Sequence, residues 1–368
     1  GSRIAVVFNG SPLFTGDAGS GESNIRRWII ENDWLEAVIA LPDQMFYNTG
    51  IYTYIWLVSN QKAENRKGKV QLIDATSHYQ KTANNLANKH KELSEAHIED
   101  ITKLYSNFKN DDVSGVVTTK TGEPKVCSKI FSNQAFGYLK ITVERPLRLN
   151  FQVSAERIAK LDEQSAFVNL AVSKKVKDEK KIAEDEATGR SQQQAIKDAL
   201  ATMDGDILYK DRTEFLKVFN PVMKGLSFTL PAPVRKAILE ALSERDPTAE
   251  ICTDSKGNAE PDPQLRDSEL VPLPSDIALP LPVGFDNETG LDKLLELVKP
   301  HIGAYMQAEV LPHVADAWVD FSKTKVGYEI PINRHFYVYE PPRPLEVIKG
   351  EIDELEGQIM AMLKGLSA

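Results

Sequence analysis

Residues 36–58, EAVIALPDQMFYNTGIYTYIWLV, contain the two apolar segments that decide the fold. Ala37–Leu41 and Tyr52–Val58 each have the composition of a β-strand, and a short loop separates them. A parallel connection between neighbouring strands needs about a dozen residues or more, usually including a helix. The two segments are therefore predicted to pair antiparallel, so the sheet reverses direction here.

The residues upstream of this hairpin predict a parallel strand, helix and strand. Ile4–Phe8 is a continuous apolar run, which is typical of a strand buried on both faces. A polar loop with several glycines spans Asn9–Gly21, and Ser20 can cap a helix that places Ile25 and Trp28 on one face. Strand, helix and strand at this spacing favour a right-handed parallel crossover. The first 58 residues thus predict an α/β sheet whose last strand runs against the others.

The same segment resembles a known family. Residues 5–51, AVVFNGSPLFTGDAGSGESNIRRWIIENDWLEAVIALPDQMFYNTGI, are similar to the modification subunit of type I restriction-modification systems, a site-specific, adenine-specific DNA methyltransferase. VLPHVADAWVD at 310–320 and VGYEIPINRHFYVYEPPRPLE at 326–346 are similar to the same family, in the same order. The resemblance implies the carboxyl-terminal part of a Rossmann-like sheet that uses S-adenosylmethionine and ends in an antiparallel strand.

Two motifs of that family are absent from this sequence. They are the cofactor loop, Gly-x-Gly after a strand, and the catalytic Asn-Pro-Pro-aromatic tetrapeptide, and in the family both precede the strand that here begins at Ile4. Asn220-Pro221 is followed by Val222, and the glycines at 19 and 21 follow a loop rather than a strand. The resemblance therefore implies a piece of a longer protein, with no catalytic residue in this chain and the cofactor bound mainly by other residues.

The composition is typical of a soluble protein and indicates that the chain needs a partner to bind DNA. The 368 residues leave room for two or three domains, and 42% of them are hydrophobic. No apolar run of about 18 residues and no signal pattern is present, so a cytoplasmic protein without membrane contact is expected. Cys127 and Cys252 are too few for a disulfide scaffold or a metal cluster, and no metal is expected. Phosphate binding needs clustered Lys and Arg, so the net charge of −9 indicates that a partner contributes much of the affinity for DNA.

The chain is predicted to divide into four consecutive parts. These are the carboxyl-terminal part of a methyltransferase domain (1–149), a helical and connector region with acidic and proline-rich stretches (150–300), a DNA or subunit contact region (301–343) and a heptad helix for subunit association (344–368).

Within these parts the sequence predicts several further elements. Lys69–Asp74 reads as a strand and His97–Phe108 as a helix, while Phe136–Leu149 alternates like a strand that stops at its proline. Residues 173–200 form either a solvated helix or a flexible connector, because they carry many charges and few large apolar side chains. Residues 291–310 are predicted as two short helices separated at Pro300.

The carboxyl terminus carries a heptad seam, in which apolar residues recur at alternating spacings of three and four. These residues are Leu345, Ile348, Ile352, Leu355, Ile359, Met362 and Leu366. A seam of this kind needs a helical surface, either on the same chain or on a partner subunit. The prolines at 341, 342 and 344 form a stiff spacer that favours a partner, and the resemblance implies the specificity subunit. It also implies DNA, a restriction subunit and a second modification subunit as partners.

Two loops are candidates for the reaction crevice, because ligands of open α/β sheets bind beyond the carboxyl ends of the parallel strands. The first predicted strand runs into Asn9, Gly10 and Ser11, and the second into the loop that carries Phe46 and Tyr47. In the resembled enzymes an aromatic residue on the second loop stacks on the rotated adenine. The resemblance implies Phe46 or, as second choice, Tyr47 in that role, whereas either ring could instead cap the core of the sheet.

Two further groups are candidates for contact with DNA or another anion. The backbone amides at Gly19 and Gly21 could bind an anion at the start of a helix, with Arg26 and Arg27 nearby, although loop flexibility alone explains the glycines. The second group could contact the DNA backbone or a subunit, or could belong to a solvated strand flanked by core aromatics. Its members are Lys323, Lys325, Asn333, Arg334 and His335.

The resemblance implies that the complete enzyme transfers a methyl group from S-adenosylmethionine to the exocyclic amine of adenine. Such a reaction relies on positioning and electrostatic stabilisation rather than covalent catalysis. This chain alone is then expected to be inactive, supplying the stacking wall and the partner contacts. The alternative is a non-catalytic scaffold derived from a methyltransferase, which binds DNA or protein.

Overall fold

The chain forms two compact units, each assembled from separate segments. The computed structural model describes residues 1–285, 289–339 and 344–366. Residues 1–137, 272–288 and 327–368 make up the first unit, and residues 138–271 and 289–326 the second. The four consecutive parts expected from the sequence differ from these units, because the chain leaves the first unit after Gly137 and returns to it twice.

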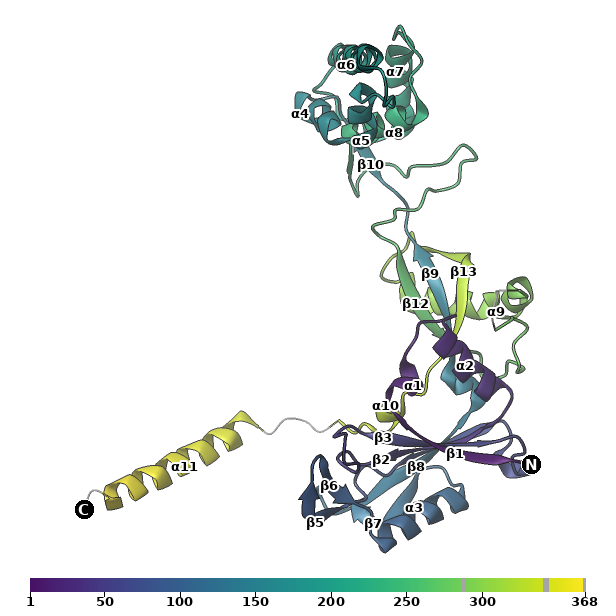
Figure 1. Cartoon of the computed structure of the whole chain (residues 1–368), viewed down its shortest axis with the longest axis vertical. Helices are drawn as coiled ribbons and strands as arrows, with labels where there is room; N and C mark the ends of the chain where they lie inside the picture. The colour runs from purple at the N-terminus through teal and green to yellow at the C-terminus, as the bar shows by residue number, and fades with distance from the viewer. Residues whose placement is uncertain (286–288, 340–343, 367–368) are drawn as a thin grey trace. The chain divides into compact units, whose positions relative to one another are not determined.

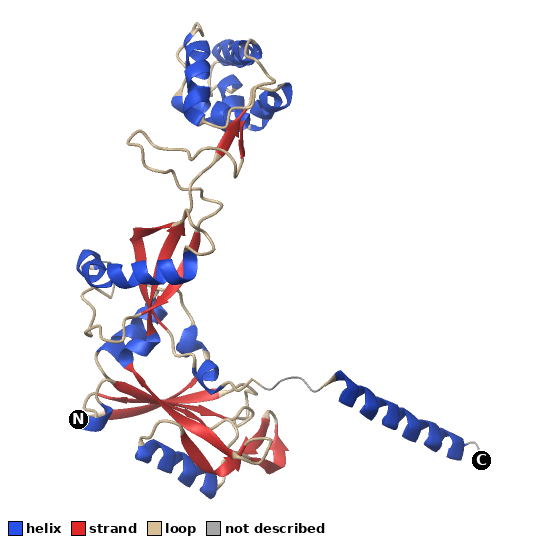
Figure 2. Ribbon diagram, turned by 180° about the vertical axis from the view of Figure 1, so that it is seen from behind, coloured by secondary structure: helices blue, strands red, loops and turns tan. Residues whose placement is uncertain are grey.

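A six-stranded mixed sheet lies at the centre of the first unit, with its strands drawn in red in Figure 2. Its strand order is β1-β3-β2-β4-β8-β7. The strands are β1 (Arg3–Asn9), β2 (Leu35–Leu41), β3 (Thr53–Ser59), β4 (Lys69–Asp74), β7 (Asp112–Thr118) and β8 (Pro124–Ser132).

The predicted reversal of the sheet is confirmed. Strand β3 runs antiparallel to β2, with Ala40 opposite Tyr54 and Leu41 opposite Thr53, and it is also antiparallel to β1. Strands β2 and β4 are parallel. The short loop after Leu41 thus inserts β3 between β1 and β2, and the mixed α/β fold class follows from this order.

Strand β1 is an edge of this sheet, so the two-sided burial expected for Ile4–Phe8 is not found in the described residues. Ile4 is 57% exposed and Val7 is 52% exposed. Only β3 pairs with the strand within the described part of the chain. An apolar edge of this kind invites association unless another segment covers it.

Helices lie on both faces of the sheet. Helix α3 (Glu95–Asn107), predicted from the spacing of its apolar residues, contacts β4, β7 and β8. Its Ile101 and Leu104 join a core with Ile39, Leu41 and Ile73. Because side chains alternate along a strand, the residues next to these core positions point to the opposite face. There the short helix α10 (Ile332–Phe336) contacts β4 and β8.

A buried arginine pair ties three segments of the first unit together. Helix α1 (Ser11–Phe14) is followed by α2 (Gly21–Glu31), whose Arg26 and Arg27 are 2% and 1% exposed. Arg26 Nε donates to the carbonyl oxygen of Tyr328 at 2.6 Å, and Arg27 Nη2 donates to that of Val283 at 2.7 Å. Arg27 Nε also pairs with Glu31 at 2.8 Å. These contacts explain why two later segments of the chain return to this unit.

The second unit contains a three-stranded sheet and a separate cluster of helices (Figure 1). The sheet consists of β12 (Asp267–Pro272), β9 (Gly137–Glu144) and β13 (Trp318–Tyr328) in that order. The cluster consists of α4 (Ala155–Ala159), α5 (Ser165–Val168), α6 (Glu179–Ala201), α7 (Arg212–Lys224) and α8 (Ala232–Leu242), with the two-stranded sheet of β10 (Leu149–Phe151) and β11 (Ser243–Arg245).

Most predicted elements of the second unit are confirmed, with one exception. Strand β9 ends before Pro146, and the charged stretch forms helix α6, which buries Ile196 and Leu200 in the core of the cluster. The prediction of two short helices is wrong, because α9 (Leu291–Tyr305) continues through Pro300. Proline removes one backbone hydrogen bond, but the apolar stripe that includes the buried Ile302 stabilises the helix on both sides of it.

The heptad segment forms helix α11 (Leu345–Leu366), as predicted. Most of its described seam side chains are exposed, for example Leu355 at 57% and Met362 at 68%, and Ile348 is half-buried. The side chain of Leu366 lies outside the described residues. Among the helices that the structure describes, none is both long enough and apolar enough to cross a membrane.

Candidate functional site

The two predicted crevice loops leave the same edge of the sheet. Asn9, at the end of β1, and Leu41, at the end of β2, both lie opposite Thr53 of the strand between them. The loops that begin after these residues are therefore neighbours in space. This is the carboxyl edge of the parallel strands, where open α/β sheets bind their ligands.

The first crevice loop is short and tightly turned. Asn9 Oδ1 accepts a hydrogen bond from the backbone N–H of Ser11 at 3.2 Å, and helix α1 begins directly afterwards. A Cβ atom at Gly10 would lie 3.4 Å from Cε2 of Tyr54. This is an ordinary van der Waals distance, so the loop passes beside the ring of Tyr54 at the start of β3 without requiring a glycine there.

The second crevice loop presents its two aromatic rings to solvent. Phe46 is 37% exposed and Tyr47 is 58% exposed, and a backbone bridge between Phe46 and Thr49 closes the tip of the loop. Met45 packs against the core beneath the sheet. Since Met45 makes the core contact, both rings have exposed surface with which to meet a planar ligand.

A two-stranded hairpin of β5 (Gln80–Leu86) and β6 (Lys89–Glu92) braces this loop. The backbone N–H groups of His90 and Lys91 donate to the carbonyl oxygen of Gln44 at 3.0 and 3.1 Å. Asn88 N–H donates to the carbonyl oxygen of Tyr47 at 3.2 Å, and Lys89 Nζ lies 5.3 Å from the centre of the Tyr47 ring. This hairpin is not among the elements predicted from the sequence, and its one local signal is the Asn-containing turn at residues 84–88.

A pocket of about 230 Å³ opens near the ends of β2 and β4 on the α10 face of the sheet. It is lined by Ala40, Tyr52, Asp74, Thr76, Ile332, Asn333 and Phe336. Asn333, predicted as a DNA or anion contact, thus lies in a concave site. The aromatic residue that the β2–β3 connection contributes to the lining is Tyr52, and neither Phe46 nor Tyr47 is among the lining residues.

The electrostatics of this pocket are set by Asp74. Lys125 Nζ lies 2.7 Å from its carboxylate, and the hydroxyl and N–H groups of Thr76 donate to it at 2.5 and 3.0 Å. Burial opposes ionisation, but these hydrogen bonds outweigh it and hold the pKa of Asp74 below its ordinary value. Asp74 is therefore an anion at neutral pH, and its role here is to accept hydrogen bonds.

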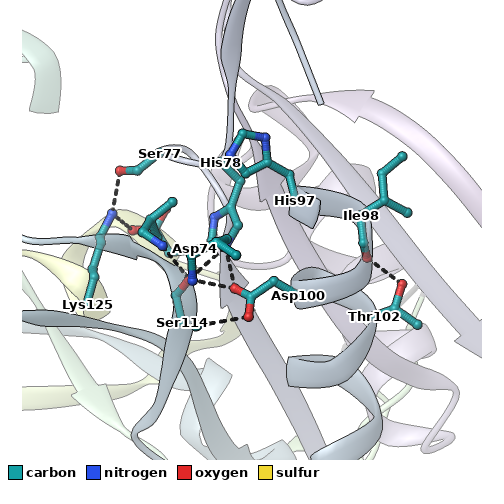
Figure 3. Close-up of polar contacts among 12 residues, drawn as sticks. Asp74, Ser77, His78, His97, Ile98, Asp100, Thr102, Ser114 and Lys125 are labelled. Carbon is teal, nitrogen blue, oxygen red and sulfur yellow. Dashed lines mark hydrogen bonds and ion pairs between the residues drawn. The ribbon is translucent and has the colours of Figure 1, made fainter. Parts of the chain in front are cut away.

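His78, Asp100 and Ser114 form a buried polar cluster beside the pocket (Figure 3). Asp100 Oδ2 lies 2.9 Å from His78 Nε2, and Ser114 Oγ lies 3.3 Å from the same nitrogen. Ser114 also donates to Asp100 at 2.5 Å. A nucleophilic triad needs the serine and the carboxylate on different nitrogens of the imidazole, so this cluster is structural.

The pKa shifts of His78 and Asp100 agree with the hydrogen bond between them. Burial lowers the pKa of His78, and the hydrogen bond to Asp100 offsets only part of that effect. Burial opposes ionisation of Asp100, but hydrogen bonds from Ser114, His78 and the Gly115 N–H outweigh it and lower the pKa. His78 is therefore neutral and donates from Nε2, while its Nδ1 has no hydrogen-bond partner among the described residues.

The predicted anion site at helix α2 needs correction. Arg26 and Arg27 are buried and donate to carbonyl groups within the protein, so they do not face a phosphate. The N-terminus of α2 is capped by Ser20, whose Oγ accepts from the backbone N–H of Ser23. Gly19 has φ of +78°, which supplies the turn, and Gly21 starts the helix. The glycines thus serve the turn and the cap.

The predicted group of basic residues near the carboxyl terminus is divided between the two units. Lys323 and Lys325 belong to the second unit, and Lys323 pairs with Glu144 and Asp320 at 3.1 and 2.8 Å. In the first unit, Arg334 is exposed, whereas the ring of His335 lies 4.2 Å from that of Phe131. Among the described residues, no cluster of His, Cys, Asp and Glu could hold a metal ion.

Comparisons with known proteins find matches to the first part of the chain. The N-6 DNA Methylase family matches residues 1–129. The type I restriction enzyme MjaVIII methylase subunit of Methanocaldococcus jannaschii is 34% identical over 110 residues, which are 30% of this chain and 18% of that protein. The HindI methylase subunit of Haemophilus influenzae is 45% identical over 73 residues, 20% of this chain and 16% of that protein.

A solved structure shows a similar but partial likeness. The type I restriction-modification methyltransferase subunit of Streptococcus thermophilus superposes with a TM-score of 0.29 and 25% identity, over 36% of this chain and 24% of that one. The chain spans about a fifth of the length of the curated relatives that it matches. The resemblance predicted from residues 5–51 is confirmed by these relatives, and the match to the N-6 DNA Methylase family covers residues 1–129.

Proposed function

We propose that this chain is part of a cytoplasmic DNA adenine methyltransferase of a type I restriction-modification system. The enzyme would transfer a methyl group from S-adenosylmethionine to the exocyclic amine of adenine. The family match over residues 1–129 and the names of the relatives support this proposal. The observation that carries it is the convergence of the loops after β1 and β2 at one edge, where Asn9 and Leu41 both face Thr53.

The contribution of this chain would be to hold the target base. A methyltransferase must extract adenine from the helix and place it in a pocket. The exposed ring of Phe46 or Tyr47 would stack on the extracted base, and the loop of Asn9, Gly10 and Ser11 would form the facing wall. The amine lone pair is delocalised into the ring, so the site must align the amine nitrogen and accept its hydrogen bonds.

The described residues do not fit the methyl donor. The glycines of Gly19-Ser20-Gly21 cap helix α2 and do not form a loop at the end of a strand. We assign the donor and the hydrogen-bond acceptors for the amine to a Gly-x-Gly loop and an Asn-Pro-Pro-aromatic motif, neither of which occurs in these 368 residues in the required context. This chain alone should accordingly be inactive.

Helix α11 would join the chain to the specificity subunit. Its heptad seam presents exposed apolar side chains such as Leu355 and Ile359, which a partner helix could cover. In the same proposal, residues 301–343 contribute contacts to DNA or to a subunit. A restriction subunit and a second modification subunit would complete the assembly.

A methylation assay tests the proposal. Transfer of a tritium-labelled methyl group to duplex DNA would be measured for the 368-residue chain alone and for the chain assembled with the specificity subunit and a polypeptide that carries both missing motifs. We expect incorporation only in the assembly. Methylation by the chain alone would refute its inactivity. DNA binding by the assembly without any methylation would instead support a non-catalytic scaffold.

A further inference from the structure

The β5–β6 hairpin has a composition unlike the rest of the chain. Its sequence, QKTANNLANKHKE at 80–92, contains three lysines and one glutamate, a net charge of +2, whereas the whole chain carries −9. The hairpin is a two-stranded sheet of its own, outside the hydrogen-bonded order of the six-stranded sheet. It is therefore a cationic element on an acidic protein, which is the local arrangement that phosphate binding requires.

The tip of the hairpin carries an exposed apolar side chain. Leu86 pairs with Lys89 across the turn, and Ala87 between them has φ of +51°. Leu86 is 55% exposed, and Asn84 and Asn88 are exposed as well. No described core cluster includes Leu86. A single exposed leucine is common on protein surfaces, but its place at the tip of a cationic ribbon leaves it free to contact a ligand that the lysines attract.

Both ends of the hairpin are anchored in the scaffold. The chain enters it after His78, which is buried and bonded to Asp100 on helix α3. It leaves through Ser94, which caps α3 in a reciprocal pair of hydrogen bonds with His97. The rings of His78 and His97 meet edge to face with 5.9 Å between their centres, and Figure 3 shows them side by side. Contacts with helix α3 thus hold both ends of the hairpin in place.

The hairpin is also fastened to the proposed base-stacking loop. The hydrogen bonds to the carbonyl oxygens of Gln44 and Tyr47 join β6 and the turn to that loop. Lys91 forms an ion pair with Asp43, and its Nζ lies 4.1 Å from the centre of the Tyr79 ring. Whatever ligand meets Phe46 and Tyr47 therefore lies next to the hairpin.

We propose that this hairpin enters a groove of the DNA beside the target adenine, with Leu86 wedged into the base stack. A two-stranded ribbon fits the major groove, and Asn and Lys side chains are typical contacts to base edges and phosphates. Apolar wedges, leucine among them, open base steps in other DNA-binding proteins. Lys81 and Lys89 contact the flanking phosphates. The inference rests on the proposed function, because it assigns the hairpin the role of helping to extract the base.

A fluorescence experiment on the complete methyltransferase assembly tests the wedge. The probe is a duplex with 2-aminopurine at the target position, whose emission rises when the base leaves the stack. We expect Leu86→Ala to lower the emission of the bound duplex by about fivefold while the Kd changes less than about threefold, since extraction costs a few kcal/mol. Lys103→Ala on the exposed face of α3 is the matched control and leaves emission and Kd unchanged.

A second DNA substrate shows whether Leu86→Ala impairs extraction of the base or weakens DNA binding in general. A mismatched partner opposite the target base makes extraction cheap, so it should restore the emission seen with Leu86→Ala. For Lys89→Ala we expect weaker DNA binding. The slope of the logarithm of the binding constant against the logarithm of the salt concentration should become shallower by about 0.9 for each lost phosphate contact. Extraction by Leu86→Ala equal to wild type, or a defect that the mismatch does not restore, would overturn the inference.

Results with the wild-type assembly distinguish failure of the proposed function from failure of the role proposed for the hairpin. If it neither methylates DNA nor extracts 2-aminopurine, the proposed function fails. If it does both and the Leu86 and Lys89 variants behave like wild type, only the role of the hairpin fails.

Discussion

Nε2 of His78 lies 2.9 Å from Oδ2 of Asp100, and this hydrogen bond joins the entry of the β5–β6 hairpin to helix α3. Both side chains are buried. The hairpin in turn holds the loop of Phe46 and Tyr47 through backbone hydrogen bonds. A polar contact in the interior of the protein therefore fixes the position of two exposed candidate residues.

The stability of the first unit should decrease as the pH falls below the ordinary histidine pKa of 6.5. Burial lowers the pKa of His78 in the folded protein, so the unfolded chain takes up the proton first. The free energy of unfolding then falls from pH 6.5 down to the folded pKa. Asp100, whose pKa is also lowered, adds a second loss below 3.8. Thermal unfolding midpoints between pH 7.5 and 5 measure the first effect.

The variant His78→Gln should remove this first dependence, because Gln can still donate to Asp100 but does not titrate. His313→Gln, at an exposed position in the second unit, is the control and should keep the wild-type pH profile. An unchanged profile in His78→Gln would contradict the assignment.

Removing one partner of the buried pair of Arg27 and Glu31 should destabilise the first unit by about 3–5 kcal/mol. The two side chains are 2% and 0% exposed, so Arg27→Ala would leave an uncompensated buried carboxylate. Urea unfolding followed by tryptophan fluorescence checks this, since Trp28 lies on the same helix. Replacing both partners with Leu should cost less than Arg27→Ala, and exposed Arg334→Ala should cost almost nothing.

Loss of the stacking ring should slow methylation by the assembled enzyme. Stacking of a base on an aromatic side chain contributes about 1–3 kcal/mol, so Phe46→Ala should lower kcat/KM by about 5- to 150-fold. Tyr47→Phe keeps the ring and should remain within about twofold of wild type. Single-turnover methylation of duplex DNA measures both. A loss confined to Tyr47→Ala would assign the stacking role to Tyr47, and no loss in either alanine variant would refute both candidates.

A charge on the heptad seam of α11 should weaken assembly without unfolding the chain. Leu355 is 57% exposed, so Leu355→Lys leaves the fold intact but places an unpaired charge in the proposed helix interface. We expect the affinity for the specificity subunit to fall at least about tenfold, measured by titration calorimetry. Val347→Lys makes a comparable change off the seam and should bind like wild type. Equal effects in the two variants would argue against the heptad interface.

Elements with a strong local pattern could be predicted from the sequence. Strands β2, β3 and β4 are short apolar runs, and helices α3 and α11 have apolar residues at helical spacing. Pro300 was misleading because its local preference against helix is smaller than the packing of the stripe around it.

The sequence by itself determined the antiparallel pairing at the reversal of the sheet, the resemblance of the first part of the chain to DNA methylases and the two loops that lie at one edge. Only the tertiary structure decided that Arg26 and Arg27 are buried, that the predicted basic group is split between two units, and that a cationic hairpin supports the loop of Phe46 and Tyr47. The physical reason is that the spacing of apolar residues predicts which face of a helix or strand is buried. Whether a charged side chain is free to bind a ligand depends instead on the carbonyl groups and carboxylates that distant parts of the chain place next to it.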